Sequence, residues 1–278
     1  MGYREEFIVQ PGSRLHLARI DPACKGKHES PEKAAPVIAE SLARIRALQY
    51  LLYADASQSL LIVLQGLDAA GKDGVIRHLF AGMNPQGTRV ASFKQPSAEE
   101  RAHDFLWRVH QHTPARGEVV IYNRSHYEDV LVVRVHALVP REVWAKRYEL
   151  INDFEQMLAE NGTRVLKFYL HISPEEQLER FKRRLDDPAR QWKISESDYQ
   201  ERSLWPDYIE AYEEALARTS TKAAPWFVIP ANHKWFRDLA IAQIVADAMR
   251  DMKLKTPPPR VDLAEIRKKY HAAARGLG

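Results

Sequence analysis

Short apolar runs alternate along the chain with segments in which apolar residues recur every three or four positions. The most continuous run, SLLIVLQ at residues 59–65, is typical of a strand buried on both faces. Before it, residues 35–53 carry apolar side chains at helical spacing, which predicts a helix. Further strands are predicted at residues 88–93, 118–122, 164–171 and 225–229.

The segments between these strands carry helix signals. Ser97 and Glu100 form a capping box, and Pro140 begins a helix with one apolar face. Further helices are predicted after residue 173 and over residues 233–252. Strands that alternate with helices in this way predict an α/β fold with a mostly parallel sheet and helices on both faces. Ligands of such folds bind where the strands end, here after Gln65, Phe93, Tyr122 and His171.

The chain shows no internal repeat and no low-complexity tract, which argues against a solenoid and against long linkers. We expect one domain over residues 1–278. Breakers such as Pro11-Gly12 predict an extended N-terminal arm over residues 1–35. Residues 253–278 form a tail that begins with a stiff proline-rich spacer, KTPPPR. The sequence leaves open whether this tail is an oligomer contact or a disordered end; for the whole protein we expect a homo-oligomer.

Composition narrows the class of protein. Hydrophobic residues make up 45% of the chain and charged residues 28%, which is ordinary usage for a globular protein. No apolar run is long enough to cross a bilayer, and the single cysteine, Cys24, favours a reducing compartment. We therefore expect a cytoplasmic protein without a membrane partner. The net charge is +4, and the stretch at residues 180–193 carries an equal excess by itself.

Residues 66–73 read GLDAAGKD, which matches the phosphate-binding pattern G-x-x-x-x-G-K, with Asp in place of the usual Ser or Thr after it. Backbone N–H groups of such a loop turn toward phosphate oxygens, and the helix that follows adds the positive end of its dipole. A predicted buried strand precedes the loop and a predicted helix follows it, as the motif requires. We therefore predict that phosphate is bound by Gly66, Ala69, Ala70, Gly71, Lys72, Asp73 and Gly74.

Two carboxylates in this loop need an explanation. Asp68 would repel the phosphates that the loop surrounds, and Asp73 stands where a hydroxyl normally binds Mg²⁺. A Mg²⁺ ion accounts for both, because it prefers carboxylate and phosphate oxygens together. For Asp73, a stabilising acid at the start of a helix is an equally good interpretation. After the strand at 118–122, neutral Asn123 replaces the usual metal-binding Asp, and Glu128 follows in its segment.

Four segments together resemble the polyphosphate kinase 2 family: GLDAAGKDG, NRSHYEDVLVVRV, RRLDDPARQWK and PWFVIPANHKWFR. They occur in family order and extend the resemblance over residues 35–250. The resemblance implies an enzyme that transfers the terminal phosphoryl group between inorganic polyphosphate and a nucleotide. It also implies Mg²⁺, with Mn²⁺ as an alternative ion, and a three-layer P-loop kinase-like fold with a helical lid, placed at residues 174–220.

The resemblance also assigns roles to residues. It implies catalytic roles for Asp68, Lys72, Arg124, Arg180 and Arg184. From the residues themselves, we expect metal binding by Asp68, Asp73 and Glu128. Further phosphate-binding cations are expected at Lys94, Arg134, Arg183 and Lys193, and the acceptor nucleotide is expected near Asn84, Pro85, Phe105, Asn123 and Glu128. The order Asn123…Glu128 is swapped relative to the commoner D-R-S-x-Y-N pattern. This form resembles the subgroup that accepts both AMP and ADP; guanine nucleotides stay open as acceptors.

The residues themselves support this interpretation, because a polyphosphate chain needs spaced cations, and Arg180 and Arg184 share one face of a predicted helix. An acceptor phosphate is already anionic, so no strong general base is required. An ATP-dependent nucleoside monophosphate kinase of the thymidylate-kinase type is the first alternative. A nucleic-acid-binding P-loop protein is the second, with Trp192 as a base-stacking residue. We expect no nucleic-acid partner and expect Trp192 to pack at the hinge of the lid.

Overall fold

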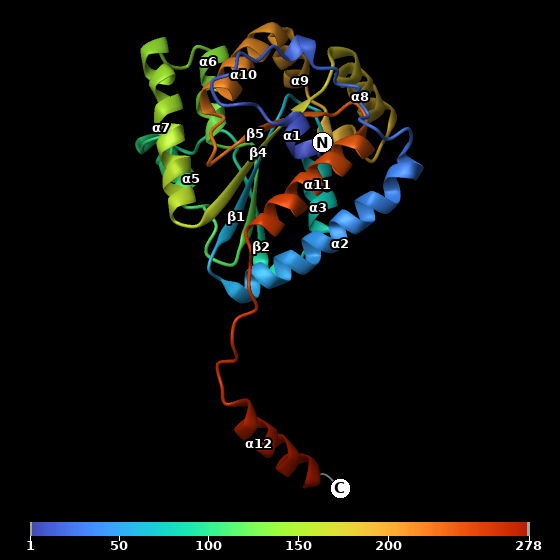
Figure 1. Ribbon diagram of the computed structural model, residues 1–278. Coiled ribbons are helices and arrows are strands. Elements are labelled where there is room, and N and C mark those ends of the chain that lie inside the picture. The colour runs from blue at the N-terminus through green and yellow to red at the C-terminus, as the bar shows by residue number, and fades with distance from the viewer. Residues whose placement is uncertain (1, 277–278) are drawn as a thin grey trace.

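Five parallel strands form the centre of the molecule in the computed structural model, which describes residues 2–276 (Figure 1). Their order across the sheet is β2-β3-β1-β4-β5, and every neighbouring pair is parallel. The strands are β1 (Ser59–Gln65), β2 (Thr88–Ser92), β3 (Val119–Asn123), β4 (Thr163–His171) and β5 (Trp226–Pro230). All five predicted strands are therefore present, with boundaries that shift by one residue at most.

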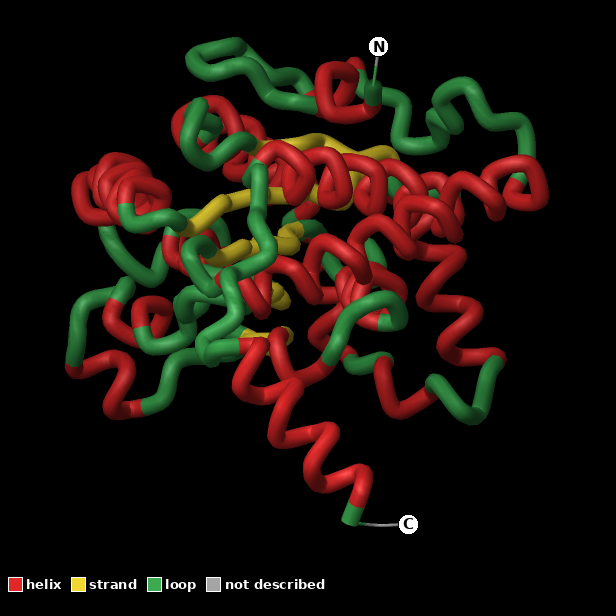
Figure 2. Tube along the Cα trace, turned by 60° about the horizontal axis from the view of Figure 1, so that its bottom comes forward, coloured by secondary structure: helices red, strands yellow, loops and turns green. Residues whose placement is uncertain are grey.

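Helices cover both faces of this sheet, so the molecule has three layers (Figure 2). The alternation of side chains along β1 shows why. Leu60 and Ile62 pack into one hydrophobic cluster, with α2 (Pro31–Asp55), α3 (Lys72–Phe80) and α11 (Lys234–Asp251). Leu61 and Val63 pack into the other, with α7 (Arg141–Glu160) and α10 (Trp205–Thr219). The α/β fold with a parallel sheet covered on both faces is confirmed.

The shorter elements lie mostly where the strands end. They are α4 (Ala98–Ala102), α5 (Trp107–His110), α6 (Val132–Val135), α8 (Pro174–Asp186) and α9 (Glu196–Ser203), together with short 3-10 turns at Leu17–Arg19, Pro85–Gly87, His126–Asp129 and Gln191–Lys193. Residues 174–220 are thus helical, as expected for a lid. In the part of the chain that the structure describes, no helix is long and apolar enough to cross a membrane.

The prediction of an extended N-terminal arm is wrong in part. Residues Tyr3–Phe7 form a helix, α1, whose Tyr3 and Phe7 rings are buried against Phe236 of α11. The chain then pairs with the last strand, where the backbone N–H of Val9 donates to the carbonyl of Trp226. Turns such as Pro11-Gly12 do interrupt this segment. The apolar side chains between the turns nevertheless bury enough surface to hold the arm against the rest of the domain.

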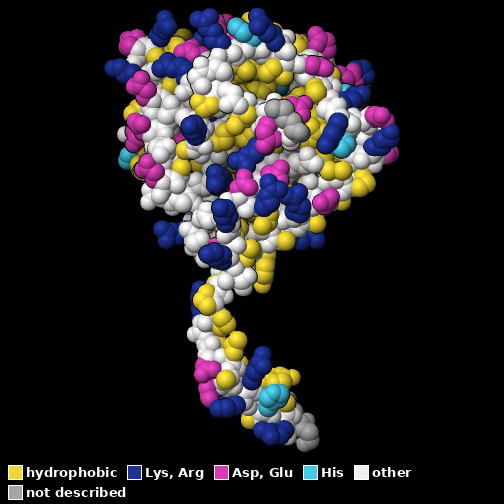
Figure 3. Space-filling model, in the orientation of Figure 1, with side chains coloured by type: hydrophobic (Ala, Val, Ile, Leu, Met, Phe, Trp, Pro, Cys, Tyr) yellow, Lys and Arg dark blue, Asp and Glu magenta, His cyan; other side chains and the backbone are white. Residues whose placement is uncertain are grey.

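Helix α2 begins at Pro31, four residues earlier than the apolar pattern indicates. Ser30 caps it by accepting a hydrogen bond from the backbone N–H of Lys33, and proline is favoured at a first helical position. At the other end of the chain, the tail leaves α11 and carries one more helix, α12 (Leu263–Arg275), which projects from the body (Figures 1 and 3). The last two residues of the predicted tail, 277 and 278, lie outside the described residues.

A buried ion pair ties α7 to the sheet. Lys167 on β4 donates to the carboxylate of Glu155 at 2.5 Å, to the Tyr127 hydroxyl at 2.8 Å and to the carbonyl of Thr219 at 2.7 Å. His126 lies 3.1 Å from the other carboxylate oxygen. Burial lowers the pKa of Lys167 to about 8, although Glu155 favours its charged form. The network keeps a charge inside the core by bonding all three ammonium protons.

We expect Glu155→Gln to lower the free energy of unfolding by about 3 kcal/mol, because it leaves the buried Lys167 charge without its partner. Urea unfolding followed by circular dichroism measures this. The matched control is Glu142→Gln, an exposed glutamate on the same helix, which should change stability by less than about 0.5 kcal/mol. Equal midpoints for the two variants would show that the pair adds nothing to the fold.

Candidate active site

The loop between β1 and α3 has the backbone of a phosphate-binding loop. Gly66 and Gly71 have φ values of 152° and 105°, and Ala69 has a φ of 62°, so the chain turns sharply three times. The φ of Gly71 is one that residues with a side chain rarely adopt, and a Cβ there would also meet the guanidinium of Arg237, so this position favours glycine. Helix α3 begins at Lys72 and places its N-terminus, the positive end of its dipole, at the loop.

Lys72 folds back over this loop. Its ammonium donates to the carbonyl of Gly66 at 2.6 Å and lies 3.4 Å from that of Leu67. Burial lowers the pKa of Lys72 to about 8, and the nearby Arg124 guanidinium lowers it further while three carboxylates oppose the shift. The lysine is therefore a poorly solvated cation that an anion at the loop would stabilise.

Arg124 joins two of the predicted metal-binding carboxylates. It donates to Asp68 at 2.8 Å and to Glu128 at 3.2 Å. These carboxylates, Glu128 first, raise the pKa of Arg124. Its backbone is in the left-handed region, with a φ of 62°, which is uncommon for a residue other than glycine. The turn after β3 thus aims the guanidinium at the loop after β1, since the two strands are neighbours in the sheet.

Asp73 contacts residues from two other elements. Asn123 at the end of β3 donates to one carboxylate oxygen at 3.0 Å, and the Lys193 ammonium lies 3.2 Å from the other. Burial raises the pKa of Asp73, but the hydrogen bonds from Lys193 and Asn123 outweigh it, so the pKa lies below its usual value. Lys193 belongs to the predicted lid, so this contact joins the lid to the phosphate-binding loop.

Arg180 is buried, and all five of its N–H groups have protein partners. It donates to the carbonyls of Ala69 and Ala70 in the loop at 2.8 and 2.9 Å, and to Glu176 on its own helix at 2.7 Å. The remaining two bonds go to the carbonyls of Ala231 and Asn232 after β5. In this structure Arg180 therefore supports the loop from outside, whereas the sequence led us to expect a side chain free to face phosphate.

Arg237 is a site residue that the sequence analysis missed. It is buried at the start of α11, where Asp238 accepts hydrogen bonds from Nε and Nη2 at 2.9 and 2.7 Å. Its guanidinium lies against Gly71 and Gly74 of the phosphate-binding segment. Lys234, one turn earlier, has its pKa lowered by burial and by neighbouring arginines. Both residues fall in PWFVIPANHKWFR, but nothing in the residue pattern says that this helix begins beside the loop.

A cavity of about 1230 Å³ opens over the loop, between the strand ends and the lid. Eleven lysines and arginines line it against four aspartates, Asp68, Asp73, Asp187 and Asp198. The cations are Lys72, Arg77, Lys94, Arg124, Arg180, Arg183, Arg184, Arg190, Lys193, Lys234 and Arg237. This excess of positive charge in one concave surface favours a polyanionic ligand.

The lid supplies several of these cations. Arg184 donates to the carbonyl of Lys193 at 3.2 Å, while Arg183 pairs with Glu179 at 3.1 Å. Trp192 also lines the cavity and is 77% exposed, with its indole N–H donating to the carbonyl of Ala189. The expectation that Trp192 packs at the lid hinge is wrong, because the turn at 191–193 points the ring outward.

Seven predicted site residues do not line this cavity. Gly66, Ala70 and Glu128 adjoin it through hydrogen bonds to Lys72, Arg180 and Arg124, whereas the other four have partners elsewhere. Arg134 pairs with Glu210 and Glu214 of α10, each at 2.6 Å, so its charge is already neutralised. The Phe105 ring lies under the guanidinium of Arg147, and Asn84 and Pro85 begin the 3-10 turn before β2, where the Asn84 N–H donates to Gln49. The sequence offered Arg134 as a cation near a strand end and the other three residues as a border of the acceptor site. It gave no information on their side-chain partners.

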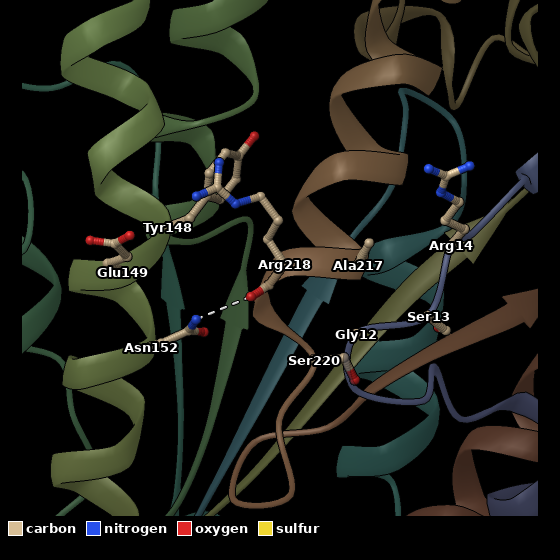
Figure 4. A pocket seen from close by; sticks show the side chains of 9 residues that line it. All are labelled: Gly12, Ser13, Arg14, Tyr148, Glu149, Asn152, Ala217, Arg218 and Ser220. Atoms are coloured by element: carbon tan, nitrogen blue, oxygen red, sulfur yellow. Dashed lines mark hydrogen bonds between the residues drawn. The ribbon is translucent and has the colours of Figure 1, made fainter.

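A second, smaller cavity of about 420 Å³ shares no lining residue with the first. It lies between α7, the end of α10 and the loop at residues 12–14 (Figure 4). Arg218 stacks on the Tyr148 ring there, and Asn152 donates to the carbonyl of Arg218 at 3.1 Å. These contacts join secondary-structure elements to one another, and none of the predicted site residues takes part.

A phosphate-binding loop after the central strand of a parallel sheet, with a lysine over the loop and a cation-lined lid, defines an enzyme of the P-loop kinase class. The profile of the polyphosphate kinase 2 family matches residues 29–257. The chain is 50% identical to an AMP/ADP-polyphosphate phosphotransferase of Meiothermus ruber, over 94% of this chain and 98% of that protein. It is 42% identical to an ADP-polyphosphate phosphotransferase of Rhodopseudomonas palustris, over 95% and 96% of the two chains.

Among solved structures, the polyphosphate kinase 2 of Arthrobacter aurescens superposes with a TM-score of 0.94 at 40% identity, covering 98% of this chain and 97% of that one. The chain belongs to the polyphosphate kinase 2 family. It is thus a polyphosphate kinase, and kinases of this family generally use a divalent metal ion. The resemblance identified from the four sequence segments is confirmed.

We expect Lys72→Ala to lower phosphoryl transfer at least about a hundredfold, because it removes a cation from the phosphates where charge develops. The fold should stay intact, because the substitution removes a buried charge and with it the free-energy cost of its lost hydration. Initial rates and urea midpoints measure the two effects, with the exposed Lys25→Ala as the matched control. Normal turnover in Lys72→Ala would overturn the assignment of this loop.

Polyphosphate binding should weaken as the pH rises above about 8, because Lys72 loses its proton there and with it the attraction for phosphate. Below this pH the lysine is charged and binding should be insensitive to its titration. Equilibrium binding of labelled polyphosphate between pH 7 and 10 measures the effect. Lys72→Arg is the control, since arginine stays charged over this range. The same decline in both proteins would exclude Lys72 as its source.

Proposed function

We propose that this enzyme transfers the terminal phosphoryl group of inorganic polyphosphate to AMP and to ADP, which gives ADP and ATP. The observation that carries the proposal is the cavity over the loop, where eleven cations face four carboxylates. A chain of phosphates carries a charge at every unit, so it matches a long surface of spaced cations better than a pocket for one base does. The named activities of the Meiothermus and Rhodopseudomonas relatives support the same substrates.

The site needs no strong general base. The attacking group is a phosphate oxygen of the nucleotide, which is already anionic, so the residues have to align the reactants and neutralise charge. In this proposal, Lys72 and the N–H groups of the loop hold the transferred phosphoryl group. Arg124 positions Asp68 and Glu128, and Arg184 contributes from the lid. One phosphoanhydride bond breaks as another forms, so we propose that the transfer is reversible.

The residues fit a divalent ion bound jointly with phosphate. Asp68 and Glu128 converge on Arg124, and Asp73 lies at the start of α3. In the described part of the chain, no three acidic, histidine or cysteine side chains form a complete metal cage. This suits Mg²⁺, which usually binds through one or two carboxylates and substrate phosphates. We propose Asp68, Asp73 and Glu128 as its protein ligands, with Mn²⁺ as the alternative; the ion would neutralise charge on the phosphates.

The proposal that the enzyme uses both AMP and ADP depends on Asn123 and Glu128, whose order is swapped relative to the D-R-S-x-Y-N pattern. Asn123 donates to Asp73 at the loop, while Glu128 accepts a hydrogen bond from Arg124. We propose that a neutral residue at 123 and an acidic residue at 128 leave room for either nucleotide next to the loop. Asn84, Pro85 and Phe105 stay candidates for the border of the acceptor site. Guanine nucleotides, a cytoplasmic location and the absence of a nucleic-acid partner stay predictions as well.

The test is a set of assays with long-chain polyphosphate, Mg²⁺ and either AMP or ADP, without ATP. We expect ATP from ADP, and ADP followed by ATP from AMP. Chelation of the metal with excess EDTA should stop both reactions, and addition of Mg²⁺ should restore them. Asp73→Asn is a useful variant, because it keeps the shape of the side chain and removes one proposed ligand.

Each outcome has a separate meaning. Product from ADP alone would restrict the enzyme to one acceptor and overturn the role given to Asn123 and Glu128. No product from polyphosphate, with transfer from added ATP to AMP, would assign the protein to nucleoside monophosphate kinase activity. Full activity in EDTA would remove the metal from the proposal.

A further inference from the structure

The turn after β3 sends its side chains in two directions. Arg124 and Glu128 bond to each other, and Arg124 also reaches Asp68 in the phosphate-binding loop. The residues between them, His126 and Tyr127 among these, are fully buried. Buried polar side chains need hydrogen-bond partners inside the protein. The course of the turn, and with it the position of Arg124, therefore depends on what its buried side chains contact.

Glu155 on α7 is the partner of two of them. The Tyr127 hydroxyl donates to its Oε1 at 2.9 Å, and Nε2 of His126 lies 3.1 Å from the same oxygen. Lys167 bonds to the other carboxylate oxygen. Because an ionised carboxylate only accepts hydrogen bonds, the proton of the His126 bond is on Nε2. One buried carboxylate thus holds two consecutive residues of the turn.

A second contact joins the turn to the end of β1. The Ser125 hydroxyl accepts a hydrogen bond from the Gln65 side chain at 3.1 Å, and Gln65 directly precedes the phosphate-binding loop. The same hydroxyl accepts from the backbone N–H of Tyr127 at 3.2 Å. The backbone N–H of Arg124 donates to the carbonyl of Leu64, also at 3.2 Å. These bonds fix the start of the turn, while Glu155 fixes its middle.

The backbone of Arg124 needs this support. Its φ of 62° is in the left-handed region, where residues with a side chain persist only if the surrounding structure holds them. Glu155 itself is buried and does not line the cavity over the loop, so it acts on the site through other residues. Since apolar residues often replace a buried ion pair without loss of stability, stability alone does not explain the pair of Glu155 with Lys167.

We infer that Glu155 is a positioning residue for phosphoryl transfer. It holds the turn after β3 through His126 and Tyr127. The held turn keeps the Arg124 guanidinium within hydrogen-bond reach of Asp68. A displacement of about 1 Å in a reacting or orienting group can lower a rate about a hundredfold, so small movements of this turn matter. The inference rests on the role proposed for Arg124.

Two substitutions release the turn and keep the carboxylate. His126→Phe and Tyr127→Phe each leave a ring in the core and remove one donor to Glu155. We expect the double variant to lower kcat at least about tenfold, through misplacement of Arg124. KM and equilibrium binding of long-chain polyphosphate should stay unchanged, because Lys72 and the lid are untouched. His126→Gln, which keeps an N–H donor at similar reach, should retain most of the rate.

Ile151→Ala is the matched control for loss of stability. Ile151 is fully buried on the same helix and packs in the hydrophobic cluster, so its truncation leaves a cavity. The urea midpoint should fall at least as far as in the double variant. The kcat, measured well below the unfolding temperature, should equal that of the wild type, because the turn keeps both bonds to Glu155.

An Arg124→Ala background separates positioning from general damage. If the turn acts through Arg124, the double substitution should lower kcat less than about twofold when Arg124 is already absent, since effects that share one intermediary do not add. Luciferase detection of ATP formed from ADP measures the low residual rates. Damage to the fold would instead multiply the two losses.

Several results would overturn the inference. They are an unchanged kcat in the double variant, an equal loss with and without Arg124, and an equal loss in Ile151→Ala. Low activity in Arg124→Ala together with a fully active double variant would overturn the positioning role alone. Full activity in Arg124→Ala would overturn the role proposed for Arg124, and the role of Glu155 with it.

Discussion

The guanidinium of Arg180 holds together three segments of the active site, which come from different parts of the chain. Its five hydrogen bonds reach the loop after β1, the loop after β5 and its own helix in the lid. Hydrogen bonds from a charged donor are stronger than neutral ones, and a buried arginine needs all of them to offset its lost hydration. The phosphate-binding loop is therefore held in its shape from outside, through its carbonyl groups and not through its N–H groups.

The same region concentrates charge that the protein does not neutralise by itself. Asp68 and Asp73 are engaged by Arg124 and Lys193, whereas the pKa of Lys72 and that of Lys234 lie below their ordinary values because burial and neighbouring arginines oppose their charge. Such a cluster costs free energy in the absence of an anion. When a phosphate chain binds, it relieves this repulsion between the cations. The affinity of the site therefore depends on the charge of the substrate.

The sequence predicted the elements well and the side-chain contacts less well. Apolar runs identified β1, β3, β4 and β5, and the segment GLDAAGKD identified the loop, because both signals are local. Arg237 was missed because its position depends on where α11 begins in space. Arg134 was misplaced for a similar reason: its partners, Glu210 and Glu214, are about eighty residues away in the chain. The roles of the site residues stay predictions until they are measured.

The strand order also bears on how the protein is made. The central strand β1 pairs with β3 and β4, and the sheet is completed by β5, whose residue Phe227 bridges Ile8 in the N-terminal arm. The apolar face around Tyr3 and Phe7 therefore finds its partners only in β5 and α11, which are synthesised much later than α1. Contacts of such long sequence separation are slow to form. Until α11 has been synthesised, a nascent chain of this enzyme therefore exposes apolar surface that the folded protein buries.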